Sequence, residues 1–185
     1  MAARPDREPT RYELQQYITT AMDVTNSSSK ARSWARHQLI DQAVRTGRAM
    51  DWDGVATLMH GFCCNLKYSE LEKYQRLCPT KTEKNWARHR MLSIAETSNE
   101  RDVWESLSLI MHQYLDVSPD VLRRFAKFYP QDGTDTSAQA CSYARQKADS
   151  IEDQKFEAVF GRRFGTPRWL QKAYIVHRTS CPELL

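Results

Sequence analysis

The sequence predicts an all-α protein in which a three-helix unit of about fifty residues is duplicated in tandem. The tetrapeptide Trp-Ala-Arg-His occurs at Trp34–His37 and again at Trp86–His89, so the two copies are 52 residues apart. Residues after each copy recur at the same offset, and after a one-residue deletion the agreement continues to a proline. The matching pairs are Leu39-Ile40 with Met91-Leu92, Ala43 with Ala95, Trp52-Asp53 with Trp104-Glu105, Val55 with Leu107, Leu58-Met59-His60 with Ile110-Met111-His112, Phe62 with Tyr114, and Leu71, Tyr74, Leu77 and Pro79 with Leu122, Phe125, Phe128 and Pro130. Because Trp, His and Met are rare residues, this agreement indicates a duplication.

The composition favours a helical and globular chain. The 185 residues include only 6 Gly and 7 Pro, which favours helices over a turn-rich β fold. Hydrophobic residues make up 41% and charged residues 27%, which is typical of a domain that buries a core. No apolar run approaches the roughly 20 residues that a bilayer span needs, so we expect no membrane association.

The cysteines and the first residues bear on localisation, and the net charge bears on partners. Five Cys, an odd number without the spacing of an extracellular disulfide framework, predict reduced thiols. The first nine residues resemble neither a signal peptide nor a transit peptide, so we expect a cytoplasmic or nuclear protein. A net charge of +4 and a pI near 8.8 are compatible with an anionic partner, and equally with an ordinary soluble protein.

Residues 1–28 are expected to form a flexible arm followed by one helix. Thr10 and Glu13 have the spacing of a capping box, in which each side chain accepts a hydrogen bond from the other residue's backbone N–H. Apolar residues then follow at helical spacing, which predicts a short amphipathic helix. These residues are Leu14, Tyr17, Ile18 and Ala21.

The first unit is predicted over residues 29–79. Its first helix carries Trp-Ala-Arg-His and ends at Gly47, where a left-handed conformation would stop it. Asp51 is expected to cap the second helix. The third helix is expected to begin with a Ser-x-x-Glu capping box from Ser69 to Glu72, and it must end at Pro79.

The second unit, residues 80–130, follows the same plan. Its first helix is expected to begin near Thr82. Its third helix opens with Ser118 and Pro119, a cap followed by proline at the first helical position, and it ends before Pro130. The shared caps and stops support the helical prediction in both units.

The C-terminal segment, residues 131–185, is predicted to form two helices after a linker. The linker is residues 131–136, and the last helix is expected over residues 166–177, starting at a Thr-Pro pair. Tyr-Ala-Arg-Gln at residues 143–146 partly matches Trp-Ala-Arg-His. A degenerate third unit within residues 137–177 therefore remains one interpretation.

The repeated Trp and His residues are expected to be structural. They lie three residues apart and share one helix face, whereas the Arg points to the opposite face. We expect Trp34 and Trp86 to be core anchors, and His37 and His89 to be buried or half-buried hydrogen-bonding groups.

One group of residues has the spacing of half a zinc site. His60 is followed by Cys63 and Cys64, which a helix would present close to it. The equivalent residues in the second unit are Leu115 and Asp116, and no paired Cys-x-x-Cys occurs. We therefore expect no metal and no cofactor.

Cations recur on the face opposite the Trp. Arg36 lies one turn after Arg32, and Arg88 lies one turn after Lys84. Like charges four residues apart repel one another, so a duplicated pair predicts a compensating anion. The anion is either the phosphate of a nucleic acid or an acidic residue of the same fold, and a solvated face is the remaining alternative.

A second basic stretch mixes cations with aromatic residues near the C-terminus. Such a mixture suits phosphate contacts with base stacking, and it equally suits docking on protein. Its candidate binding residues are Arg162, Arg163, Arg168, Trp169 and Lys172. Arg123-Arg124 is a third basic spot, and its equivalents Glu72-Lys73 suggest that it does not belong to the duplicated unit.

No catalytic motif accompanies these features. The chain has no glycine-rich phosphate loop, no His-Glu-x-x-His and no Gly-x-Ser-x-Gly. The sequence therefore favours a non-catalytic nucleic-acid-binding protein, more readily for RNA than for DNA. Such a protein could self-assemble along its ligand as a packaging or RNA-sequestering factor, for example a viral one. The alternatives are a protein-interaction scaffold, effector or adaptor whose helical grooves bind a partner, and, third, a metal-stabilised or catalytic protein.

Overall fold

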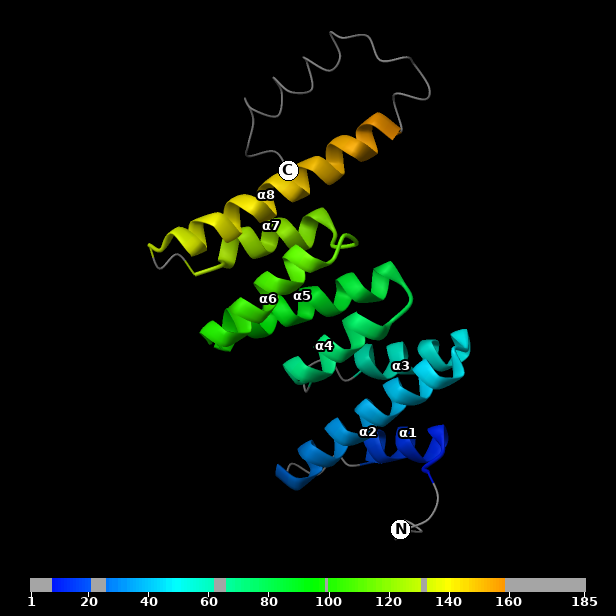
Figure 1. Ribbon diagram of the computed structural model, residues 1–185. Coiled ribbons are helices and arrows are strands. Elements are labelled where there is room, and N and C mark those ends of the chain that lie inside the picture. The colour runs from blue at the N-terminus through cyan, green and yellow to red at the C-terminus, as the bar shows by residue number, and fades with distance from the viewer. Residues whose placement is uncertain (1–7, 21–25, 62–65, 99, 131–132, 159–185) are drawn as a thin grey trace.

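The fold is all-helical, as the sequence predicts. The computed structural model describes residues 8–20, 26–61, 66–98, 100–130 and 133–158 (Figure 1). These residues form eight α-helices and no strand. The helices are α1 (Arg11–Thr20), α2 (Asn26–Thr46), α3 (Ala49–Gly61), α4 (Tyr68–Leu77), α5 (Lys81–Ser98), α6 (Arg101–Gln113), α7 (Pro119–Phe128) and α8 (Asp135–Phe156).

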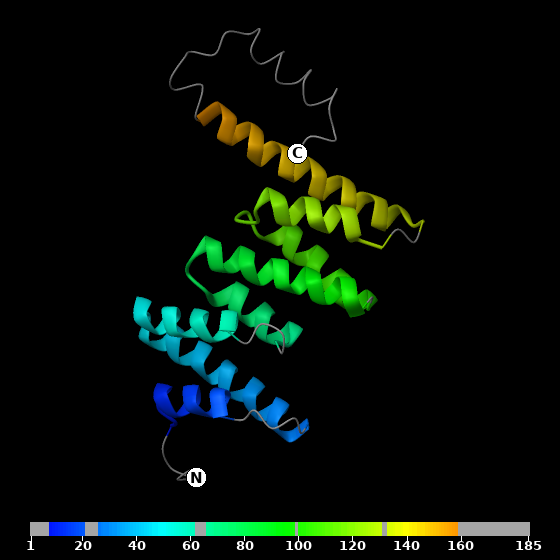
Figure 2. The same cartoon turned by 180° about the vertical axis from the view of Figure 1, so that it is seen from behind.

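The helices are stacked in chain order along one long axis. Figures 1 and 2 show α1 and α2 at one end of the stack and α8 at the other. α2 packs against α1, α3 and α4, while α5 packs against α4, α6 and α7. α8 packs against α6 and α7. The hydrophobic core therefore runs along the stack instead of forming one central cluster, and an inner helix such as α5 is buried on two sides.

Two pairs of helices have equal lengths in the two halves of the stack. α3 and α6 each contain 13 residues, and their first residues, Ala49 and Arg101, are 52 positions apart. α4 and α7 each contain 10 residues, as does α1. α2 and α5 differ more, with 21 and 18 residues.

Several predicted helix ends are confirmed. Glu13 accepts a hydrogen bond from the Thr10 backbone N–H at 2.6 Å, and Thr10 Oγ1 accepts one from the Glu13 N–H at 3.3 Å. Ser118 Oγ accepts from the Val121 N–H at the start of α7. Gly47 has φ +63°, the left-handed conformation that ends α2 without steric cost.

Two predicted caps are wrong, by three residues at α3 and by two residues at α4. α3 begins at Ala49, so Asp51 lies inside its first turn, where it accepts hydrogen bonds from Thr46 and Arg11. α4 begins at Tyr68, and its capping carboxylate is Glu70 instead of Glu72. Both carboxylates also contact residues that are distant in sequence, Asp51 contacting Arg11 and Glu70 contacting Arg36.

The structure adds one observation on membranes. Within the described ranges, none of the helices combines the length and the apolar character that crossing a bilayer requires.

Candidate interaction face

Arg36 lies inside the stack and does not face solvent. Its Nη1 donates to Glu70 Oε2 at 3.0 Å, and the side chains of Arg36 and Glu70 are only 3% and 0% exposed. The same Glu70 oxygen also accepts from the Lys67 backbone N–H at the start of α4. The ion pair thus joins α2 to the N-terminus of α4, where a carboxylate is favoured by the helix dipole.

Arg88 is buried even more completely and contacts several acceptors. Its side chain is 0% exposed, and its Nη2 donates to Asp116 Oδ1 at 2.7 Å. Its other nitrogens donate to Gln75 Oε1 and Asn85 Oδ1, and the guanidinium lies over the Tyr114 ring. Partial burial disfavours the charged form of Asp116. The hydrogen bond and charge of Arg88, with the charge of Lys84, outweigh it and hold the Asp116 pKa below its usual value.

The prediction that Arg36 and Arg88 lie on an outward phosphate-binding face is therefore wrong. Their compensating anions are acidic residues of the same fold, which is the alternative weighed from the sequence. Lys84 is half-buried and contacts Asp116 at 3.3 Å, and Arg32 is half-buried as well. The helical wheel places Trp and Arg on opposite faces, but in a stack both faces meet other helices.

Trp86 packs between two residues of the preceding unit. Its ring stacks on His60 of α3, with centroids 4.0 Å apart and planes 11° apart. It also meets Tyr74 of α4 edge-on at 6.3 Å. His60 in turn lies 2.8 Å from Glu83, which accepts a hydrogen bond from the Tyr74 hydroxyl. The half-buried Trp86 thus joins α5 to α3 and α4.

The same stacking recurs at the next junction. His112 of α6 stacks on Tyr143 of α8, with centroids 3.9 Å apart and planes 10° apart. His60 and His112 are equivalent positions, and Tyr143 opens the Tyr-Ala-Arg-Gln sequence. In both junctions, therefore, a histidine from a second helix packs on the aromatic residue that opens the next tetrapeptide.

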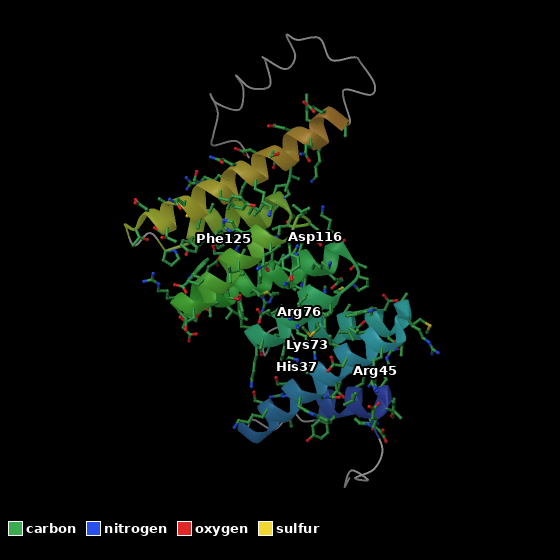
Figure 3. All side chains as sticks on the ribbon, viewed as in Figure 1. His37, Arg45, Lys73, Arg76, Asp116 and Phe125 are labelled. Carbon is green, nitrogen blue, oxygen red and sulfur yellow. The ribbon has the colours of Figure 1, made fainter. Side chains whose placement is uncertain are left out.

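Further contacts recur within the units. Lys73 Nζ donates to the His37 carbonyl at 3.3 Å, and Arg124 Nη1 donates to the His89 carbonyl at 3.3 Å. Figure 3 labels Lys73 of α4 beside His37 of α2. Lys73 and Arg124 thus each donate to the backbone carbonyl of the histidine in a Trp-Ala-Arg-His sequence. His37 and His89 are half-buried, as predicted.

The aromatic core of each half is also alike. Trp52 of α3 packs against Tyr74 of α4, with ring centroids 6.3 Å apart. Trp104 of α6 packs against Phe125 of α7, with centroids 6.1 Å apart. Phe125 is labelled in Figure 3. A Trp from each second helix thus meets an aromatic residue from each third helix.

α1 contacts its neighbours as α4 does. Both helices contain Glu-Leu-x-x-Tyr at the same distance from their first residue, with Leu14 and Leu71 buried. The first residue of α4, Tyr68, donates to Ser106 of α6 at 3.0 Å. The first residue of α1, Arg11, fills the space where a β-carbon would stand on Gly54 of α3, the position equivalent to Ser106.

α1 and α2 are more exposed on one side than α4 and α5, the helices that correspond to them. Tyr74 of α4 is 0% exposed because α3 and α5 cover it, whereas the equivalent Tyr17 of α1 is 48% exposed. Trp34 of α2 is 51% exposed, although Trp86 at the equivalent position is half-buried. The prediction that Trp34 is a core anchor is wrong, because no described helix occupies the place that α3 takes beside Trp86. We call the surface formed by Tyr17 and Trp34 the N-terminal face.

The remaining predicted site residues are outside the described part of the chain. Arg162, Arg163, Arg168, Trp169 and Lys172 fall there, as do Cys63 and Cys64 of the considered zinc site and the predicted helix over residues 166–177. Within the described residues, no group of three or more His, Cys, Asp and Glu side chains is arranged to hold a metal ion. No protein family, curated protein or solved structure matches this chain.

Proposed function

We propose that the chain is a tandem helical-repeat protein that binds other protein without catalysing a reaction. The repeated units are α2–α4 and α5–α7. α1 corresponds to the third helix of a preceding unit, and α8 to the first helix of a following one. The recurring contacts support this interpretation: Trp52–Tyr74 with Trp104–Phe125, Lys73–His37 with Arg124–His89, and His60–Trp86 with His112–Tyr143.

The exposure of Trp34 is the single observation that carries the binding proposal. Trp86 and Tyr143, at equivalent positions, each stack on a histidine from the second helix of the preceding unit. Trp34 and Tyr17 are half exposed at the end of the stack. Trp and Tyr contribute most to protein interfaces because they bury a large, rigid surface.

The expected occupant is a partner helix of defined character. In α3 and in α6, a Trp and a His lie eight residues apart. In α3, Trp52 contacts Tyr74 and His60 contacts Trp86. In α6, Trp104 contacts Phe125 and His112 contacts Tyr143. A helix with that spacing presents both rings on one side. The N-terminal face offers Tyr17 and Trp34, the residue types that α3 meets, so it suits an amphipathic helix of this kind.

Nucleic-acid binding is the less favoured alternative. The argument for it depended on duplicated cations exposed to phosphates, and Arg36 and Arg88 are engaged with Glu70 and Asp116. What remains of it is the basic and aromatic stretch around Trp169, which suits protein docking equally well.

A peptide-binding experiment tests the proposal. A fluorescein-labelled peptide with the sequence of Ala49–Gly61 is titrated with the full chain, and its fluorescence anisotropy is recorded. We expect a dissociation constant on the order of 10 µM and a loss of at least about tenfold in Trp34→Ala. Leu115→Ala is the matched control, because Leu115 is 88% exposed and lies away from the N-terminal face.

A titration with labelled RNA distinguishes the alternative. RNA affinity is measured at about 50 mM and about 200 mM salt, between which a backbone binder must weaken steeply. Salt-sensitive RNA binding without peptide binding would overturn the proposal in favour of nucleic acid. Peptide binding that Trp34→Ala leaves unchanged would also overturn it.

A further inference from the structure

The sequence after α8 repeats the pattern of α3 and α6. Trp169 and His177 lie eight residues apart, as do Trp52 and His60, and Trp104 and His112. The residues before each histidine match as well: Leu58-Met59, Ile110-Met111 and Ile175-Val176. Residues 166–177 therefore have the sequence of a second helix following α8.

We propose that residues 166–177 are the helix that binds the N-terminal face of a second copy of the chain. Copies then join head to tail into a continuous stack, with His177 of one copy stacked on Trp34 of the next. This inference rests on the proposed function and names its partner. The equivalent pairs His60–Trp86 and His112–Tyr143 define the geometry, with ring centroids 4.0 Å and 3.9 Å apart.

The partner is a second copy because of where the two surfaces lie. α1 and α8 are at opposite ends of the stack, with α2 to α7 between them (Figures 1 and 2). A second helix that packed on α8 as α3 packs on α2 would lie at the end of the stack opposite to Tyr17 and Trp34 of its own chain. A heterologous contact of this kind repeats from copy to copy and builds a ring or a filament.

In this arrangement, helices from two copies would together form one three-helix unit at the junction between the copies. α8 and residues 166–177 of one copy take the places of a first and a second helix, and α1 of the next copy takes the place of a third. Trp169 then meets Tyr17, as Trp52 meets Tyr74 at 6.3 Å.

Charge complementarity supports the same arrangement. Arg145 occupies in α8 the position of Arg36 in α2, and Glu13 occupies in α1 the position of Glu70 in α4. Arg36 and Glu70 form a buried pair at 3.0 Å, whereas Arg145 and Glu13 are both exposed at the two ends of the stack. Glu13 also accepts from the Thr10 N–H as Glu70 does from the Lys67 N–H, so its carboxylate is oriented alike. Head-to-tail contact would bring Arg145 and Glu13 together.

The test is the mass of the full chain in solution. Sedimentation equilibrium is measured over a range of protein concentrations. We expect the average mass to rise above 21.6 kDa with concentration and, if the stack stays open, to pass twice that value. Trp34→Ala and His177→Ala should each weaken association at least about tenfold. Circular dichroism checks that both variants keep their helix content.

Mixing the variants identifies a head-to-tail interface. Trp34→Ala retains an intact C-terminal helix and His177→Ala retains an intact N-terminal face. Together they should form a one-to-one dimer that neither forms alone. Glu13→Arg and Arg145→Glu should each weaken association, and the chain that carries both should recover it.

The outcomes separate this inference from the proposed function. A chain that stays at 21.6 kDa at every concentration overturns the head-to-tail inference. So does an assembly that Trp34→Ala and His177→Ala leave intact. If the Ala49–Gly61 peptide still binds at Trp34 in such a chain, the proposed function stands with a different partner. If the peptide does not bind either, both fail.

Discussion

Trp34 and Trp86 begin identical tetrapeptides, and yet one is half exposed and the other packs between His60 and Tyr74. Tyr17 and Tyr74 form a second such pair, at 48% and 0% exposure. The difference lies in the neighbours. α5 has a helix on each side, whereas α2 lacks a described counterpart of α3 on its outer side. A repeated motif therefore acquires its role from its place in the stack.

The largest effect should separate Tyr74 from Tyr17. Tyr74→Ala removes a fully buried ring between Trp52 and Trp86, which should lower the free energy of unfolding by about 3–5 kcal/mol. Tyr17→Ala should change it far less. Urea denaturation of both variants, at concentrations where the chain is monomeric, measures this contrast. Equal losses would show that Tyr17 is as buried as Tyr74 and would contradict the view that its face is open.

Replacing the buried Arg36 should lower the free energy of unfolding much more than replacing the exposed Arg145. Arg36→Ala leaves the Glu70 carboxylate buried without its ion pair, which should cost about 3 kcal/mol or more. Arg145→Ala should leave the stability of the monomer unchanged, because Arg145 is exposed. In the double variant Arg36→Met with Glu70→Leu, stability should largely return, since neither charge remains buried. Urea denaturation of the three variants provides the comparison.

The stacked tryptophan should contribute less than Tyr74, because it is only half-buried. Trp86→Ala should lower the free energy of unfolding by about 2–3 kcal/mol through loss of its contacts with His60 and Tyr74. Trp34→Ala should lower it much less, because about half of the side chain is exposed, and should mainly weaken association. A loss equal to that in Trp86→Ala would contradict the view that its face is open.

The smallest expected effect is the contribution of His37 and His89 to the pH dependence of the free energy of unfolding. Burial, then the charge of Lys73, lowers the pKa of His37, while burial and then the charge of Arg124 lower that of His89. The folded chain thus binds protons at these sites less readily than the unfolded chain. Their contribution to stability should be complete above the unfolded pKa of about 6.5 and decline as the pH falls through that value toward the lowered folded pKa.

Thermal unfolding between pH 7.5 and pH 5 measures this decline. Replacing His37 and His89 by Gln should flatten the curve. Leu115→Ala, at an exposed position without a titratable side chain, is the control and should leave the slope unchanged.

The sequence predicts the helices well because local signals set them. The Thr10–Glu13 box, Gly47 and Ser118-Pro119 act within a few residues, and the structure confirms each of them. The caps at Asp51 and Ser69 are misplaced, and the nearby carboxylates are held by contacts that are distant in sequence, Asp51 by Arg11 and Glu70 by Arg36.

The binding residues are harder to predict because periodicity does not say which face of a helix meets a neighbour. Helical periodicity correctly places Trp34 and Arg36 on opposite faces of α2. The prediction that Arg36 faces solvent and Trp34 faces the core is wrong, because Arg36 is buried and Trp34 is half exposed. One signal could have corrected this. Glu-Leu-x-x-Tyr occurs at Glu13 and again at Glu70, and the second copy marks the acidic partner of Arg36.

The stacking order of the helices also has a kinetic consequence. The principal contacts join helices that are neighbours or next neighbours along the chain. Such a molecule closes few long loops as it forms, so its folding should be fast for its length. Arg88 links α5 to Gln75 of α4 across the boundary between the two halves, so this residue would couple the two halves into one cooperative transition.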